Sequence, residues 1–137
     1  MRIKYVKARR ILDSRGRFTI EVDVLTECGV GRASAPSGAS VGRYEAQSLP
    51  EGGISAALQR MRRQVAPALE GVDVEDQATL DKTIEDIDGT SGFSNIGASA
   101  ALATSMAAAK AGAISQGKPL YRYLTESTAY NLPIPLG

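Results

Sequence analysis

The sequence predicts an α+β fold, in which a three-stranded antiparallel β-meander is followed by an α-helical half. Apolar and polar residues alternate in the first third of the chain, which is typical of strands, whereas the later segments repeat apolar residues with the period of a helix. The connections between the expected strands are short and rich in turn residues. Short connections favour antiparallel pairing of neighbouring strands.

Three strands are expected before residue 36. They should span residues 3–12, 19–25 and 30–35. In the second strand, three apolar side chains point to one face of the sheet, while Glu21 and Asp23 point to the other. Residues 13–16 and 27–29 supply the turns, since each segment ends in a Gly that accepts a positive φ.

Helices are expected from about residue 54 onward. The first carries an apolar face made of Ile54, Ala57, Leu58, Met61, Val65, Ala68 and Leu69. A second helix should span residues 75–87, and a third, dominated by Ala, residues 95–115. Because Ala favours helix and lets other backbones approach closely, the third helix should be buried against the sheet or a neighbouring domain. Residues 120–124 suggest one further helical turn.

Composition excludes several classes of function. The net charge of the 137 residues is +1, Trp is absent and aromatic residues make up 5%, which argues against nucleic acid as a partner. No apolar run approaches the about 18 residues of a membrane span. The N-terminal residues alternate charged and apolar side chains, and Cys28 has no second cysteine to pair with, so a cytoplasmic location is expected. With no histidine, chemistry must use carboxylates, hydroxyls, Lys or Arg, or groups supplied from elsewhere.

The main candidate site is the loop of residues 36–45, which joins the sheet to the helical half. It has no large side chain before Arg43, and its two glycines and two serines can bring backbone and hydroxyl groups close to an anion or a metal. The spacing of a phosphate-binding P-loop is missing. Local sequence leaves two interpretations open, a flexible surface linker and an active-site lid.

Two weaker candidates have ordinary structural explanations. Residues 12–16 suit a turn, and Arg15 in it could hold a carboxylate. The acidic residues Glu75, Asp76, Asp81, Glu85, Asp86 and Asp88 lie on or near the second helix. Asp81 and Glu85 are four residues apart, so a metal pair is conceivable, but a solvated helix face explains them as well.

Several blocks, in a fixed order along the chain, resemble the enolase family. They are Ala8-Arg9, Leu12-Asp13-Ser14-Arg15-Gly16, Thr19-Ile20-Glu21-Val22, Pro36-Ser37-Gly38-Ala39-Ser40 with Gly42 and Glu45-Ala46, Ser94-Asn95-Ile96-Gly97-Ala98, Pro119-Leu120-Tyr121-Arg122-Tyr123-Leu124 and Leu132-Pro133-Ile134-Pro135. Ordered blocks over nearly the whole chain are more specific than any one of them. The chain departs from the family at Arg17-Phe18, where Asn-Pro is usual, and at Val41, where Thr is usual.

The resemblance implies a cap domain at residues 1–130, with residues 131–137 beginning the link into a C-terminal β/α barrel that lies beyond this sequence. It also implies a Mg²⁺-dependent hydro-lyase (phosphopyruvate hydratase) that reversibly dehydrates 2-phosphoglycerate to phosphoenolpyruvate in glycolysis and gluconeogenesis. The catalytic lysine and glutamate, and the ligands of the tighter Mg²⁺ site, belong to the barrel. The fragment alone is therefore expected to be inactive, with no catalytic residue of its own.

The same resemblance implies roles for particular residues. The lid loop that closes over the phosphorylated substrate would comprise Ser37, Gly38, Ala39, Ser40 and Gly42. Ser40 would ligate the second Mg²⁺. Arg9 and Glu21 match positions that contact the partner's barrel in a homodimer or higher oligomer.

Two other functions remain open at this point. The chain could be a stand-alone binding module that kept the cap fold without catalysis, or the cap of another enzyme of the enolase superfamily. The Ser-Gly-Ala-Ser block at residues 37–40 favours enolase itself.

Overall fold

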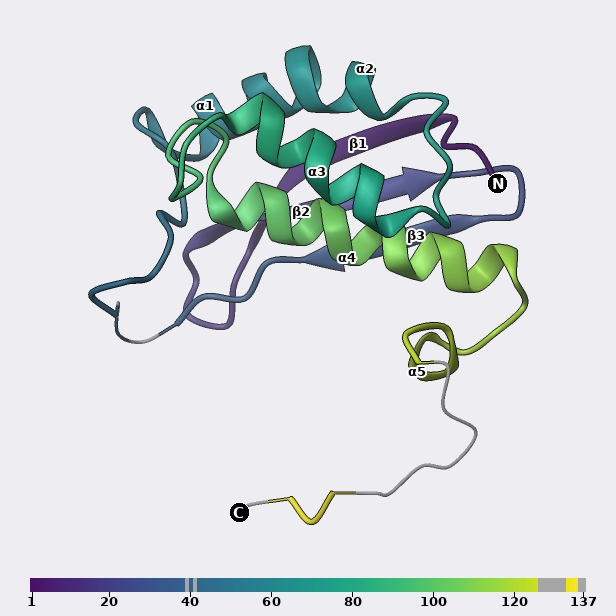
Figure 1. Cartoon of the computed structure of the whole chain (residues 1–137). Helices are drawn as coiled ribbons and strands as arrows, with labels where there is room; N and C mark the ends of the chain where they lie inside the picture. The colour runs from purple at the N-terminus through teal and green to yellow at the C-terminus, as the bar shows by residue number, and fades with distance from the viewer. Residues whose placement is uncertain (39, 41, 126–132, 136–137) are drawn as a thin grey trace.

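The computed structural model describes residues 1–38, 40, 42–125 and 133–135. A three-stranded sheet is covered on one face by helices, giving two layers (Figure 1). The strands are β1 (Tyr5–Leu12), β2 (Phe18–Leu25) and β3 (Val30–Ser34), and the helices are α1 (Gly53–Arg60), the π-helical segment η1 (Met61–Val65), α2 (Ala66–Leu69), α3 (Gln77–Asp88), α4 (Ala98–Ser115) and α5 (Leu120–Tyr123). The predicted α+β meander followed by helices is confirmed.

The strands pair in sequence order, antiparallel throughout. The alternation in β2 gives Ile20, Val22 and Val24 to the helix-covered face, where all three are fully buried. The opposite face carries Glu21 and Asp23. Arg9 of β1 lies across from Glu21 in the strand register.

Helix α4 packs across β2 and β3, as its Ala content predicts (Figure 1). Gly31 on β3 makes this possible, because a Cβ at that position would collide with the backbone of Ala107 and Ala111. Lys110 on α4 donates a hydrogen bond of 2.9 Å to the carbonyl oxygen of Arg32 on β3. The helix and the strand therefore meet backbone to backbone.

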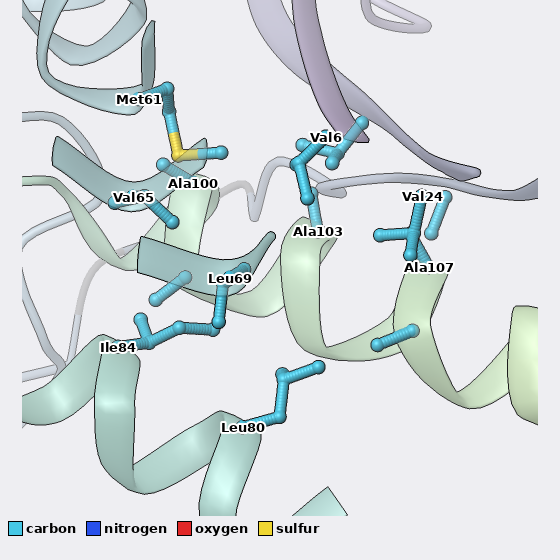
Figure 2. Packing of buried hydrophobic residues seen from close by; sticks show 14 of the residues in the cluster. Val6, Val24, Met61, Val65, Leu69, Leu80, Ile84, Ala100, Ala103 and Ala107 are labelled. Carbon is cyan, nitrogen blue, oxygen red and sulfur yellow. The ribbon is translucent and has the colours of Figure 1, made fainter. Parts of the chain in front are cut away.

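The core lies between the sheet, α4, α3 and the helical stretch from residue 53 to 69. Figure 2 shows Leu69, Leu80 and Ile84 meeting between the helices, and Val6 and Val24 facing the Ala side chains of α4. Ala68 departs from the expected apolar face, since it is exposed while Leu69 is fully buried.

The π turn of η1 explains the exposure of Ala68. The amide of Ala66 bonds to the carbonyl oxygen of Met61, five residues back, so the residues after the turn are rotated relative to a continuous α-helix. Pro67 follows directly and has no N–H with which to continue the α pattern. A strict 3.6-residue period therefore fails over the last turn of this stretch.

Helices α3 and α4 each begin later than the sequence pattern suggests. Asp76 caps α3, its carboxylate accepting a 3.1 Å hydrogen bond from the amide of Thr79. Residues 95–97 precede α4 in a loop, so this helix begins three residues later than expected. Within the described part of the chain, no helix is both long and apolar enough to cross a membrane. The predicted domain boundary at residue 130 lies outside the described residues.

Candidate active-site lid and the open face of the sheet

The loop of residues 36–45 leaves the end of β3 and projects from the body of the molecule before the chain returns to α1 (Figure 1). Ser37, Gly38, Ser40 and Gly42 are all exposed. Ala39, the fifth predicted lid residue, lies outside the described residues, as does Val41. The Ser40 hydroxyl is thus placed on a solvent-facing loop of small residues.

The N-terminal end of the loop is held by the start of β2 and by the turn between β1 and β2. The Thr19 hydroxyl donates to the carbonyl oxygen of Ala35 (2.9 Å), and the Arg15 guanidinium donates to the carbonyl oxygen of Gly38 (3.2 Å). Two candidate segments that the sequence presented separately, residues 12–16 and 36–40, therefore lie together. Arg15 binds a backbone carbonyl here and not the carboxylate that the sequence suggested.

Asp13 shapes the turn that carries Arg15. One of its carboxylate oxygens accepts hydrogen bonds from the backbone amides of Arg17 (2.8 Å) and Arg15 (2.9 Å). These amides hold the pKa of Asp13 below its ordinary value, although burial opposes them. Asp13 stays ionised near neutral pH, so the turn keeps its shape.

The C-terminal end of the loop is also fixed. The amide of Gly42 donates to the Glu45 carboxylate (2.8 Å), and the amide of Glu45 donates back to the carbonyl oxygen of Gly42 (3.2 Å). Beyond this turn, Gln47 and Ser48 are hydrogen-bonded to the segment that leads into α4. The predicted lid is thus a short loop between two anchored ends, and all of its described residues are exposed.

A groove of ≈ 450 Å³ runs beside the base of the lid. Its walls are mainly apolar and include Pro36, Ala46, Ile84, Phe93, Ala101 and Leu102. Asp81 and Glu85 line it as well, but Asp81 accepts a hydrogen bond from Gln77 (3.0 Å) and Glu85 lies 3.6 Å from the Lys82 ammonium. No group of three or more Asp, Glu, Cys or His side chains that could hold a metal occurs among the described residues.

A charge network covers the face of the sheet that carries no helices. Arg9 reaches the carboxylates of Asp23 (2.7 Å) and Glu21 (2.5 Å), and Arg32 binds the other side of Asp23 (2.6 Å). Ser34 donates to Glu21 (2.9 Å). The two predicted interface residues, Arg9 and Glu21, are therefore paired with each other within the chain.

Asp23 is the centre of this network, although the sequence pattern gives it no functional role. The Arg32 guanidinium, helped by Arg9, lowers the pKa of Asp23 to about 2 against the opposing effect of burial. The two-residue spacing of Glu21 and Asp23 placed them on one face, but only the strand register brings Arg9 and Arg32 to the same point.

Comparison with known proteins places this fold and loop in a family. The model of the enolase N-terminal domain matches residues 3–124. The enolase of Methanothrix thermoacetophila is 48% identical over 98% of this chain, that of Pyrococcus furiosus 49% over 96%, and that of Halorubrum lacusprofundi 50% over 99%. The chain covers 34%, 32% and 34% of these relatives, so it spans about a third of their length. The chain belongs to the enolase family and corresponds to its N-terminal domain.

Proposed function

We propose that this chain is the lid-bearing domain of an enolase that reversibly dehydrates 2-phosphoglycerate to phosphoenolpyruvate, as part of glycolysis and gluconeogenesis in the cytoplasm. The observation that carries the proposal is the exposed loop with Ser40, anchored at both ends, in a chain that belongs to the enolase family. The base and the assisting carboxylate would come from the remaining two thirds of the protein. The chain alone would be inactive.

The lid residues suit a role at a Mg²⁺ site. Hydroxyl and carbonyl oxygens are the hard ligands that Mg²⁺ prefers, and Ser40 carries both. One residue cannot complete an octahedral site, and the described residues hold no acidic cluster, so most ligands would come from the barrel. When bound, the ions would supply positive charge to stabilise the enolate formed during dehydration.

The chain's own contribution would be closure. The small residues around Gly38 let the backbone approach a phosphorylated substrate, and a closed loop excludes water from the reacting groups. Because both ends are anchored, the movement would be confined to the residues between the anchors.

A hybrid enzyme tests the proposal. Residues 1–137 would replace the matching segment of the Pyrococcus furiosus enolase, and formation of phosphoenolpyruvate would be followed by its ultraviolet absorbance. We expect turnover by the hybrid and none by the isolated chain. A hybrid that is folded by circular dichroism but inert would favour the alternative, a non-catalytic binding module. Turnover by the isolated chain would refute the division of labour.

Ser40→Ala in the hybrid should raise the Mg²⁺ concentration needed for half-maximal rate and lower turnover by about tenfold or more, since one charge-assisted contact is worth roughly 1.5–3 kcal/mol. Ser37→Ala is the matched control within the same loop and should keep the Mg²⁺ dependence. Equal Mg²⁺ profiles for Ser40→Ala and the parent hybrid would remove Ser40 from the metal site.

The uncovered charged face of the sheet also supports a proposal of assembly. We infer that this face contacts a second subunit in the full-length enzyme, with Arg9 and Glu21 as contact residues. Arg9 is one-third exposed, so its guanidinium can reach a partner while keeping its bonds to Glu21 and Asp23.

A further inference from the structure

A buried carboxylate outside the lid organises the segment on which the lid rests. Asp88, the last residue of α3, is 1% exposed. One of its oxygens accepts hydrogen bonds from the amides of Asn95 (3.0 Å) and Ile96 (2.7 Å), and the other accepts from the amide (3.1 Å) and the hydroxyl of Thr90. The Asn95 side chain donates back to the carbonyl oxygen of Asp88 (2.6 Å). Both carboxylate oxygens are thus fully engaged.

The position of Asp88 makes these bonds necessary. A negative charge at the C-terminal end of a helix opposes the helix dipole, and burial opposes its ionisation. The hydrogen bonds from Thr90, Ile96 and Asn95 outweigh burial and hold the pKa of Asp88 below its ordinary value. Asp88 is therefore a charged anchor for residues 90–96.

This anchored segment holds the C-terminal end of the lid. The amide of Gln47 donates to the carbonyl oxygen of Gly92 (2.9 Å). In return, the amides of Ala98 (2.8 Å) and Ser99 (3.0 Å) donate to the carbonyl oxygens of Gln47 and Ser48. The first amides of a helix have no partner within it, and no side chain caps α4. The base of the lid therefore caps the long buried helix.

Gly97 allows the segment before α4 to lie close to the backbone of residues 48–50. A Cβ at Gly97 would lie 2.8 Å from Cδ of Pro50 and 2.9 Å from the carbonyl oxygen of Ser48, and its φ of +89° favours glycine. Arg60 on α1 donates to the carbonyl oxygen of Asn95, which ties the segment to a second helix. The segment is therefore held by Asp88, by residues 47–50 and by Arg60.

We propose that Asp88 is a positioning residue for the lid. It acts through residues 88–99, which we call the clasp. The clasp holds Gln47 and Ser48 on the first turn of α4. Gln47 and Ser48 then form a fixed end from which the proposed lid would close. The role in closure rests on the proposed function; the clasp itself does not.

Asp88→Asn tests the clasp. The Asn side chain has the same size as Asp, but its NH₂ group would face the amide and hydroxyl donors that bind the carboxylate. Amide hydrogen exchange of the chain, read by NMR, should show Gln47, Ala98 and Ser99 exchanging about tenfold faster or more relative to Val22, as loss of one charge-assisted hydrogen bond implies. Asp76→Asn is the control, since it makes the same chemical change at the start of α3, far from the lid, where Asn also caps a helix. It should leave this ratio unchanged.

Gly97→Ala is a second variant, which disrupts the contact of the clasp with Ser48 and Pro50 without changing Asp88. It tests the clasp if Asp88→Asn does not fold. It should accelerate exchange at Gln47 and Ser99 in the same way. Unchanged exchange ratios in a folded variant of either kind would overturn the clasp.

The hybrid enzyme then tests the role in closure. Asp88→Asn should lower kcat and raise the Mg²⁺ requirement more than Asp76→Asn does, which a general loss of stability would not do. Faster exchange without that difference would leave the clasp in place and refute its role in the lid. An inert parent hybrid would count against the proposed function and not against the clasp, which the exchange ratio alone decides.

Discussion

Replacement of Asp23 by Asn should reveal how much the charge network on the open face of the sheet contributes to folding. The Asp23 side chain is 12% exposed and lies between Arg9 and Arg32. Its pKa falls from 3.8 to about 2 on folding. At 1.36 kcal/mol for each tenfold change in proton affinity, that difference corresponds to about 2 kcal/mol of stability at neutral pH.

The contribution of Asp23 to the free energy of unfolding should depend on pH in a defined direction. Because folding lowers the pKa of Asp23, its stabilising contribution is complete above pH 3.8 and is lost as the pH falls through about 2. The free energy of unfolding of the parent chain should therefore decrease by about 2 kcal/mol more than that of Asp23→Asn between pH 5 and 2.

Urea unfolding followed by circular dichroism at pH 5, 4, 3 and 2 measures the difference. Asp86→Asn is the control, since Asp86 pairs with Lys82 at 3.0 Å on an exposed helix face, where an ion pair contributes little. If the parent and Asp23→Asn lost stability in parallel over this range, the assignment of the low pKa to the Arg9 and Arg32 contacts would be refuted.

Two further predictions concern the two faces of the sheet. Gly31→Ala should lower the free energy of unfolding, measured by thermal unfolding, by about 3 kcal/mol or more, because the added methyl meets the backbone of Ala107 and neither element can yield. Gly92→Ala is the control. Its added methyl meets nothing, so this variant should be nearly neutral. A small effect at Gly31 would mean that α4 sits farther from β3 than the structure shows. In the hybrid enzyme, Arg9→Glu should shift the assembly state seen by light scattering, while Arg10→Glu on the same strand should not; equal behaviour of the two would remove the interface role of Arg9.

The sheet could be predicted from sequence because its signal is local. Alternation over residues 19–25 fixes which side chains face the helices, and a one-residue slip would have exposed all three apolar residues of β2. The burial of α4 was predictable for a similar reason, since a helix with this much Ala favours the helical conformation and lets other backbones pack closely against it.

The helix boundaries depended on contacts that no local pattern contains. Residues 95 and 96 were expected to begin the Ala-rich helix, yet their amides are taken by the carboxylate of Asp88, so α4 begins only at residue 98. The exposure of Ala68 follows from the π turn before Pro67, which shifts the period by one residue. In both places a specific hydrogen bond overrides the regular pattern.

The candidate site could be predicted from the order of several sequence blocks and not from the chemistry of its residues. Residues 36–45 look like a linker when taken alone, and the contacts that anchor the two ends of this loop are long-range: Arg15 with Gly38 at one end, and Gln47 with Gly92 at the other. Periodicity carries no information about such pairs.

These anchors connect the loop of residues 36–45 to a helix in the core of the molecule. Helix α4 is the central element of the core, and its first amides are capped by the carbonyl groups of Gln47 and Ser48. Local opening of a protein is least frequent where backbone hydrogen bonds are buried in the core, so this end of the loop should open far more rarely than the exposed residues before it. In its proposed role as a lid, the loop of residues 36–45 would therefore close without disturbing the helix, whereas a substitution in residues 88–99 would affect the loop without touching it.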